Sequence, residues 1–198
     1  MRHRTPDPAD ETGVHDGLAY ALWRPGGSPR GGIVILHGAN SCKENHFDYA
    51  RAARAAGFAA VAFDQRGHGE SPGALDGRAI EDVAAMAALL GDGPVALRGS
   101  SMGGYLALVA AERVGARAVV AICPASGEGL LRGLHEGRLD FPADVPALEA
   151  LIAEYDAAVA ARRRRLIVMP GGHHRSVQHD PELQGETLRF VAQALEDG

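Results

Sequence analysis

The chain has 198 residues, 46% of them hydrophobic, which suffices for one domain with a full core and is too short for two ordinary domains. Its net charge of −5 disfavours nucleic acid as a main partner, because binding to phosphates needs clustered lysine and arginine. No apolar run reaches the length of a membrane span or forms the core of a signal peptide, so we expect a cytoplasmic protein without a membrane partner.

Two smaller features of the composition have simple interpretations. Cys42 and Cys123 are too few for a disulfide framework, and a reduced pair is expected in the cytoplasm. The one basic run, at 162–165, follows a helix pattern and is interpreted as a solvated helix end whose cations complement the helix dipole.

Short apolar runs alternate along the chain with longer alanine-rich stretches of helical period. This order is typical of a mostly parallel sheet with helices on both faces. Residues 1–13 are expected to be loosely ordered, and a strand pair near 14–23 is expected at an antiparallel edge. The buried strands are predicted at 32–36, 58–63, 94–97, 118–122 and 166–169, and the helices at 44–56, 80–90, 103–114, 147–161 and 182–195.

The region 124–146 interrupts this alternation. It combines glycines with Leu130, Leu131, Leu134 and Phe141 among polar residues, as a small lid over an apolar pocket would. A surface loop with a short helix is an equal interpretation. We therefore expect a single domain over 14–198, with 124–146 as a lid or irregular segment.

The sequence Gly-Ser-Ser-Met-Gly at 99–103 lies between a predicted strand and a predicted helix. In this position it predicts a nucleophile elbow, in which glycines two residues before and after a serine remove side chains that would clash in a strained turn. Ser101 is then the nucleophile. The alternative is a turn that does nothing except cap the helix.

Three further loops follow predicted strands, at the edge where open α/β sheets bind ligands. They read His-Gly-Ala-Asn at 37–40, Asp-Gln-Arg-Gly-His-Gly-Glu-Ser at 64–71 and Pro-Gly-Gly-His-His at 170–174. With the elbow, these loops resemble the α/β-hydrolase superfamily over roughly residues 14–123 and 165–197. The resemblance implies an α/β-hydrolase fold and serine-dependent hydrolysis of a small or medium acyl ester, without a cofactor.

The resemblance also assigns roles to single residues. The backbone N–H groups of Ala39 and Met102 would form the oxyanion hole, which stabilises the negative charge that develops on the carbonyl oxygen. The family's pattern after the last strand aligns His174 with the base that Ser101 needs, and leaves His173 as its neighbour. The loop at 64–71 has a structural role, and His68 is given none in catalysis.

A serine nucleophile argues against the dehalogenase and epoxide-hydrolase branches, which use a carboxylate. Adjacent histidines also occur in metal sites, yet no cysteine or carboxylate lies nearby at ligand spacing, and His179 is the only extra imidazole. No metal is therefore expected.

Three carboxylates are candidates for the acid of the triad. Asp140 is preferred, because 137–146 is similar to the turn that presents the acid in the family. Glu128 follows, since some members carry the acid after the preceding strand, and then Asp156, near the final helix–strand junction. The stretch 130–135 is a poor buried strand. The alternative function is therefore a weakly active or non-catalytic relative that binds a ligand or partner in an inherited cleft.

Overall fold

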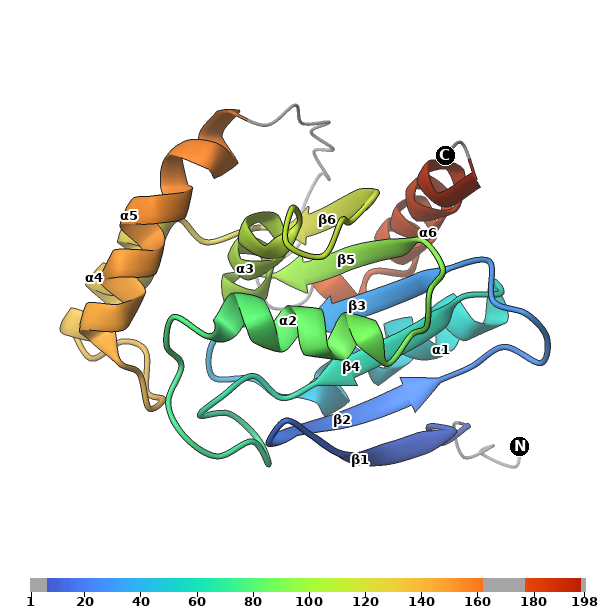
Figure 1. Cartoon of the computed structure of the whole chain (residues 1–198), viewed down its shortest axis with the longest axis horizontal. Coiled ribbons are helices and arrows are strands. Elements are labelled where there is room, and N and C mark those ends of the chain that lie inside the picture. Colours follow the sequence, from blue (N-terminus) through green and yellow to red (C-terminus); the bar gives the residue numbers. More distant parts are fainter. Residues whose placement is uncertain (1–6, 162–176, 197–198) are drawn as a thin grey trace.

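A six-stranded sheet, most of whose strands are apolar runs, forms the centre of the computed structural model, which describes residues 7–161 and 177–196 (Figure 1). The strands are β1 Glu11–His15, β2 Leu18–Trp23, β3 Gly32–Leu36, β4 Ala59–Phe63, β5 Val95–Ser100 and β6 Ala118–Ile122. Their order across the sheet is β1-β2-β4-β3-β5-β6. The first two strands are antiparallel, and the other four run parallel to one another, as predicted.

The parallel strands end level with one another. Leu36, the last residue of β3, pairs with Phe63 at the end of β4 and with Gly99 near the end of β5. The loops that follow these three strands therefore meet at one edge of the sheet.

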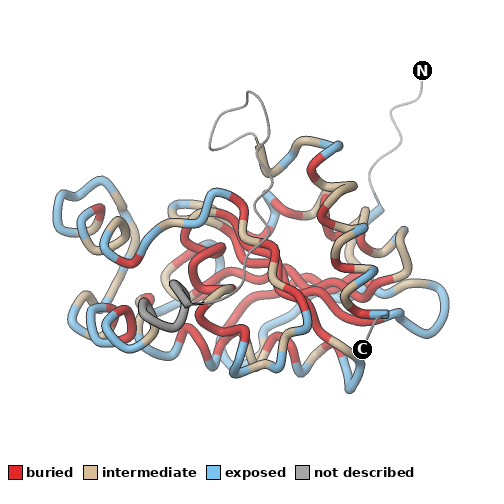
Figure 2. Tube along the Cα trace, turned by 90° about the horizontal axis from the view of Figure 1, so that it is seen from above, coloured by how far each residue is buried: buried red, intermediate tan, exposed pale blue. Residues whose placement is uncertain are grey.

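Helices cover both faces of the sheet and create two cores. On one face lie η1 Lys43–His46, α1 Phe47–Ala55 and α6 Pro181–Glu196, and on the other lie α2 Ala79–Ala88 and α3 Met102–Ala110. Side chains of a strand alternate between faces, so Ile33 and Ile35 of β3 belong to the first core while Val34 and Leu36 belong to the second. Figure 2 shows the buried residues concentrated along the strands and the inner sides of the helices.

The region 124–146 contains a helix and a strand-like stretch. Helix α4, Gly127–His135, is capped by Ser126, whose Oγ accepts a hydrogen bond from the N–H of Gly129 at 3.0 Å. After it, the N–H of Leu75 donates to the carbonyl of Pro142 at 2.9 Å, and Leu75 forms an isolated parallel bridge with Ala143. Helix α5, Val145–Ala161, then packs with α4 outside α3 (Figure 1).

The N-terminal hairpin is longer than the predicted strand pair. Asp16 and Gly17 both have positive φ angles, 51° and 79°, as a two-residue turn of type I′ requires. The strand before this turn begins at Glu11, so the stretch 11–13, which the sequence places in the loosely ordered segment, pairs with β2. The predicted strand at 166–169 and the basic run at 162–165 lie outside the described residues.

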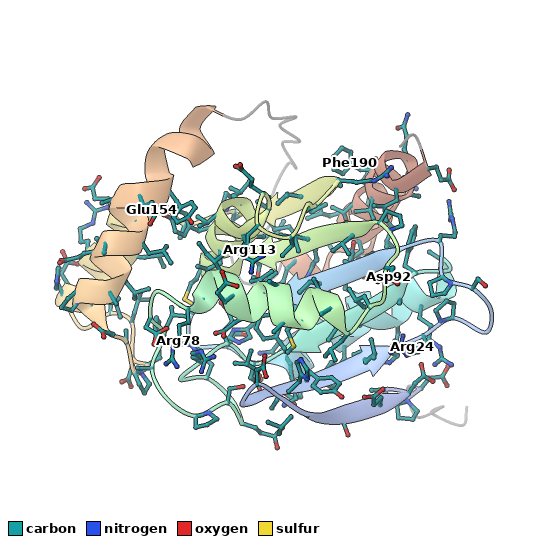
Figure 3. All side chains as sticks on the ribbon, in the orientation of Figure 1. Arg24, Arg78, Asp92, Arg113, Glu154 and Phe190 are labelled. Atoms are coloured by element: carbon teal, nitrogen blue, oxygen red, sulfur yellow. The ribbon has the colours of Figure 1, made fainter. Side chains whose placement is uncertain are left out.

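Charged side chains lie both outside and inside this fold. Figure 3 shows Arg78, Arg113 and Glu154 at the surface, where Arg113 pairs with Glu81 of α2 at 2.8 Å. Arg98 and several groups at the carboxyl edge of the sheet are buried instead. Among the helices of the described part, none combines the length and apolar character that crossing a membrane requires.

Candidate active site

Ser101 sits in a strained turn between β5 and α3. Its backbone has φ 52° and ψ −118°, a conformation that costs free energy for any residue with a side chain. Neighbouring backbone holds it there: the N–H of Ser101 donates to the carbonyl of Ile122 at 2.9 Å, and the N–H of Ala125 donates to the carbonyl of Ser101 at 3.0 Å. The turn has the geometry expected of a nucleophile elbow.

The two glycines of the elbow are required by close backbone contacts. A Cβ atom added to Gly99 would lie 2.0 Å from the carbonyl oxygen of Gly103, and one added to Gly103 would lie 2.3 Å from the carbonyl oxygen of His37. Any other residue at either position would push β5, α3 and the loop after β3 apart.

The loop after β3 lies against Ser101. A Cβ atom added to Gly38 would be 3.3 Å from the Cβ of Ser101, so the backbone of this loop passes directly beside the serine. Ala39 is the next residue of the loop, and Met102 is the first residue of α3, where free N–H groups and the helix dipole favour negative charge. The structure therefore brings Ser101 together with both segments that the sequence assigns to an oxyanion hole.

His37 fixes the start of this loop from inside the protein. Its Nε2 accepts a hydrogen bond from the N–H of Gln65 at 3.0 Å, and the side-chain amide of Gln65 donates to the carbonyl of His37 at 2.7 Å. The ring is 1% exposed, and this burial lowers the pKa of His37 to about 4. His37 is thus neutral at physiological pH, as an acceptor at Nε2 must be.

The loop at 64–71 is ordered by packing and by backbone contacts. The hydroxyl of Ser71 donates to the carbonyl of Asp64 at 2.6 Å and accepts from the N–H of Ala19 at 2.9 Å. The buried ring of His68 packs between those of His37 and Phe141, with centroid distances of 5.0 and 4.3 Å. His68 therefore joins the loop after β3 to the segment after α4.

The structure describes some of the candidate base and acid residues but not others. His173 and His174, and the side chain of Asp156, lie outside the described residues. Asp140 is exposed, and its N–H donates to Oδ1 of Asn40 at 3.1 Å, which puts the backbone of Asp140 beside the loop that carries Ala39. Glu128 is exposed on α4 and faces Arg132 at 3.5 Å.

A buried cation that the sequence analysis did not single out lies on the strand that leads to Ser101. Arg98 donates from Nη2 to the carbonyl of Gln178 at 2.9 Å, its Nη1 lies 2.8 Å from Nδ1 of His46, and it stacks over the ring of Tyr49 at 4.2 Å. Burial, and then the charge of Arg98, lower the pKa of His46 well below its ordinary value. The only signal in the sequence is an arginine inside an otherwise apolar strand.

A second feature missed in the sequence is an imidazole–carboxylate pair. Nδ1 of His179 lies 3.0 Å from Oδ2 of Asp48 in α1, and the same oxygen accepts from the amide of Gln184 at 2.9 Å. Burial alone would raise the pKa of Asp48, but the hydrogen bonds from His179 and Gln184 outweigh it and hold the pKa below its ordinary value. No local pattern pairs two residues so far apart in the sequence.

A narrow apolar pocket opens between α3 and the α4–α5 pair. It is lined by Leu75, Met102, Tyr105, Leu106, Leu130, Leu131, Leu134, Phe141, Leu148, Leu151 and Ile152. No carboxylate, amine or guanidinium belongs to this lining, which consists of described residues only. Nor do three His, Cys, Asp or Glu side chains of the described part come close enough together to hold a metal ion.

Comparison with known proteins identifies the class of this chain. The family model described as "Serine aminopeptidase, S33" matches residues 27–136, which is more than half of the chain. The chain therefore belongs to this family of α/β hydrolases. No curated protein matches it.

Two solved structures that match nearly the whole chain support the same fold. A Xanthomonas campestris protein, described as an α/β serine hydrolase without lid, is 20% identical over 96% of this chain and 95% of its own, with a TM-score of 0.61. A protein of Thermoplasma acidophilum, described as a predicted CIB-like hydrolase, is 21% identical over 92% and 97%, with a TM-score of 0.62. A monoacylglycerol lipase of Paleococcus ferrophilus is 30% identical over 55% of this chain, with a TM-score of 0.49, and the match spans 44% of that lipase.

The low pKa of His37 makes the fold sensitive to acid. The unfolded chain takes up a proton on this residue near pH 6.5, whereas the folded protein does so only near pH 4, so acid favours unfolding. We expect His37 alone to lower the free energy of unfolding by about 2 kcal/mol between pH 7 and pH 5. Urea denaturation of wild type and His37→Gln at both pH values measures this term.

His15→Gln is the control for the removal of a histidine, because His15 is half-buried at the end of β1 and does not belong to the loop after β3. Equal losses between pH 7 and pH 5 in wild type and His37→Gln would contradict the prediction.

Proposed function

We propose that this α/β hydrolase is a serine esterase that cleaves a small or medium acyl ester through an acyl-enzyme. The observation that carries the proposal is Ser101 at a positive φ angle on the turn between β5 and α3, with the backbone at Gly38 directly beside it. This arrangement supports a nucleophile and an oxyanion hole that share one small volume.

In the proposed reaction, Ser101 attacks the carbonyl carbon while His174 takes the proton from its hydroxyl. The N–H groups of Ala39 and Met102 stabilise the oxyanion, and His174 then returns the proton to the departing alcohol. Water, activated by the same imidazole, releases the acid from Ser101. Asp140 orients His174 in this proposal, and the hydrogen bond from its N–H to Asn40 supports a place near the oxyanion loop.

The apolar pocket supports an acyl chain as the specificity group. Met102 lines the pocket and its own N–H is the proposed oxyanion donor, so the pocket lies next to the proposed position of the reacting carbonyl. An aminopeptidase must also hold the charged amino group of its substrate, and the lining of this pocket contains no carboxylate for that purpose. An acyl ester therefore fits this pocket better than an amino-acid amide.

Two free thiols support a cytoplasmic location as part of the proposal. Cys42 is half-buried and Cys123 is exposed, and neither is paired in a disulfide.

A weakly active or non-catalytic relative is the second candidate function. The observation in its favour is that, between residues 7 and 161 and between 177 and 196, no strand follows β6 and no hydrogen bond reaches the carboxylate of Asp140. Loss of the acid alone leaves substantial catalysis in serine hydrolases, so this candidate predicts slow turnover or none.

Replacing the serine at the elbow separates the two candidates. We expect Ser101→Ala to abolish turnover of p-nitrophenyl acetate and butyrate and to prevent labelling by a fluorophosphonate, with the fold intact by circular dichroism. Ser100→Ala is the matched control and should be mild, because Ser100 ends β5 and is buried. Labelling that persists in Ser101→Ala and disappears in Ser100→Ala would make Ser100 the nucleophile. A wild type that the fluorophosphonate does not label would favour the non-catalytic candidate.

The base is tested by two neighbouring substitutions. His174→Ala should lower kcat far more than His173→Ala, because the pattern after Pro170 matches the family at the later position. Activity of the wild type should also fall in acid, as the imidazole becomes protonated. Ester hydrolysis between pH 5 and pH 9 measures both effects, and the opposite ranking would make His173 the base.

The acid is tested in the same assay. Asp140→Asn should preserve folding and lower kcat by up to about 10⁴-fold, because it removes the charge that stabilises the protonated base and favours the wrong tautomer. Glu128→Gln and Asp156→Asn should be nearly neutral. Wild-type rates in all three variants would leave Ser101 and His174 to act without an acid from this set.

A further inference from the structure

The loop that carries Ala39 is fastened at both of its ends to the loop that follows β4. At the first end, the ring of His37 accepts a hydrogen bond from the backbone N–H of Gln65, and the side-chain amide of Gln65 donates to the backbone carbonyl of His37. At the second end, the N–H of Lys43 donates to Oδ1 of Asp64 at 2.7 Å, and its Nζ donates to Oδ2 of the same carboxylate at 2.8 Å. Between the two attachments lie five residues, including the proposed oxyanion donor.

Lys43 is the only lysine in the chain, and the rest of its 20 Lys and Arg residues are arginines. Its side chain is 5% exposed, and its ammonium contacts three carboxylates: Asp64, Glu70, and Glu44 at 2.8 Å. An ammonium has three N–H donors that point in different directions and can supply one to each carboxylate. The planar fork of an arginine suits a single carboxylate instead, which gives a physical reason for a lysine here.

Asp64 is a rigid point of attachment. It directly follows β4, its N–H donates to the carbonyl of Ala19 at 2.9 Å, and its side chain is fully buried. Its Oδ2 also accepts from the N–H of Glu70 at 3.0 Å. A Cβ atom on Gly69 would lie 2.3 Å from the carboxyl carbon of Asp64, so the surrounding loop closes tightly around this carboxylate.

The charge of Lys43 persists at any working pH. Burial alone would lower the pKa of Lys43, but its hydrogen bonds to Asp64, Glu44 and Glu70 outweigh burial and raise the pKa above its ordinary value. The second end is therefore held by an ammonium that stays charged.

We propose that Lys43 and Asp64 are positioning residues for the oxyanion hole, which hold the loop at 37–43 so that the N–H of Ala39 stays aimed at the developing charge. This inference rests on the proposed esterase function. An oxyanion donor acts mainly in the transition state, so a displaced loop lowers kcat more than it raises KM.

The test compares two buried ion pairs that share one loop. Lys43→Met removes the attachment, while Arg66→Met removes an ion pair that joins the same loop to Asp82 of α2, with contacts of 2.7 and 2.6 Å and none to the loop at 37–43. Both variants should melt at lower temperature. Only Lys43→Met should lower kcat for p-nitrophenyl butyrate, by about 10²-fold with KM little changed.

Hydrogen exchange of the backbone amides at 38–43, read by mass spectrometry, provides a measurement that does not depend on activity. Exchange should accelerate in Lys43→Met and stay at the wild-type rate in Arg66→Met. If Lys43→Met does not fold, Lys43→Arg replaces it, because it keeps the charge but not the three-way geometry, and kcat should fall by about tenfold.

A loss of kcat in Lys43→Met no larger than in Arg66→Met, or a wild-type kcat in Lys43→Arg, would overturn the positioning role. Unchanged amide exchange in Lys43→Met would overturn the attachment itself. A wild type that neither turns over esters nor reacts with a fluorophosphonate would instead overturn the esterase function, and the exchange experiment would still decide whether Lys43 holds the loop.

Discussion

Backbone packs against backbone where β5 turns into α3, with no space for a side chain between them. Gly99 faces Gly103 across the turn, and Gly103 faces the carbonyl of His37. Three segments are thereby fixed at contact distance: the strand before Ser101, the helix after it and the loop after β3. The unfavourable φ of Ser101 persists because hydrogen bonds to Ile122 and Ala125 hold the residue on both sides.

The loops at this edge need further support, which comes from buried charges. The central strand β3, Gly32–Leu36, is a fully apolar run whose register is set by burial on both faces. The loops have no such register, and they are attached by Lys43 to Asp64, by Arg66 to Asp82, and by Arg98 to Gln178. Buried ion pairs contribute little net stability compared with apolar groups of the same size. The contribution of these two ion pairs, and of the hydrogen bond from Arg98 to the backbone carbonyl of Gln178, is directional, because each contact joins two segments at a single distance.

The sequence predicted those elements whose structure depends on residues close together in the chain. Apolar runs predicted the strands at 32–36 and 118–122 to the residue, because each strand is an unbroken run of residues without a polar side chain. The Gly-Ser-Ser-Met-Gly pattern predicted the turn at Ser101, since the glycine spacing follows from contacts within the turn.

Long-range partners were not predicted from the sequence. Asp48 and His179 meet across 131 positions, and Arg98 meets Gln178 across 80. Nothing close to Lys43 in the sequence indicates that it is buried, because the carboxylate that it contacts, Asp64, follows a different strand. The acid of the triad is hard to predict for the same reason. Asp140 was chosen by a turn pattern, but its distance from an imidazole depends on how segments far apart in the sequence pack.

Met102 connects the proposed chemistry to the choice of substrate. Its N–H begins α3 beside the elbow, and its buried side chain forms part of the wall of the apolar pocket. Phe141 lies on the same pocket and packs against His68, which in turn packs against His37 in the loop of Ala39. A change in the packing around Phe141 would reach the loop after β3 through His68, so in the proposed esterase the pocket and the proposed oxyanion donor at Ala39 are coupled through these rings.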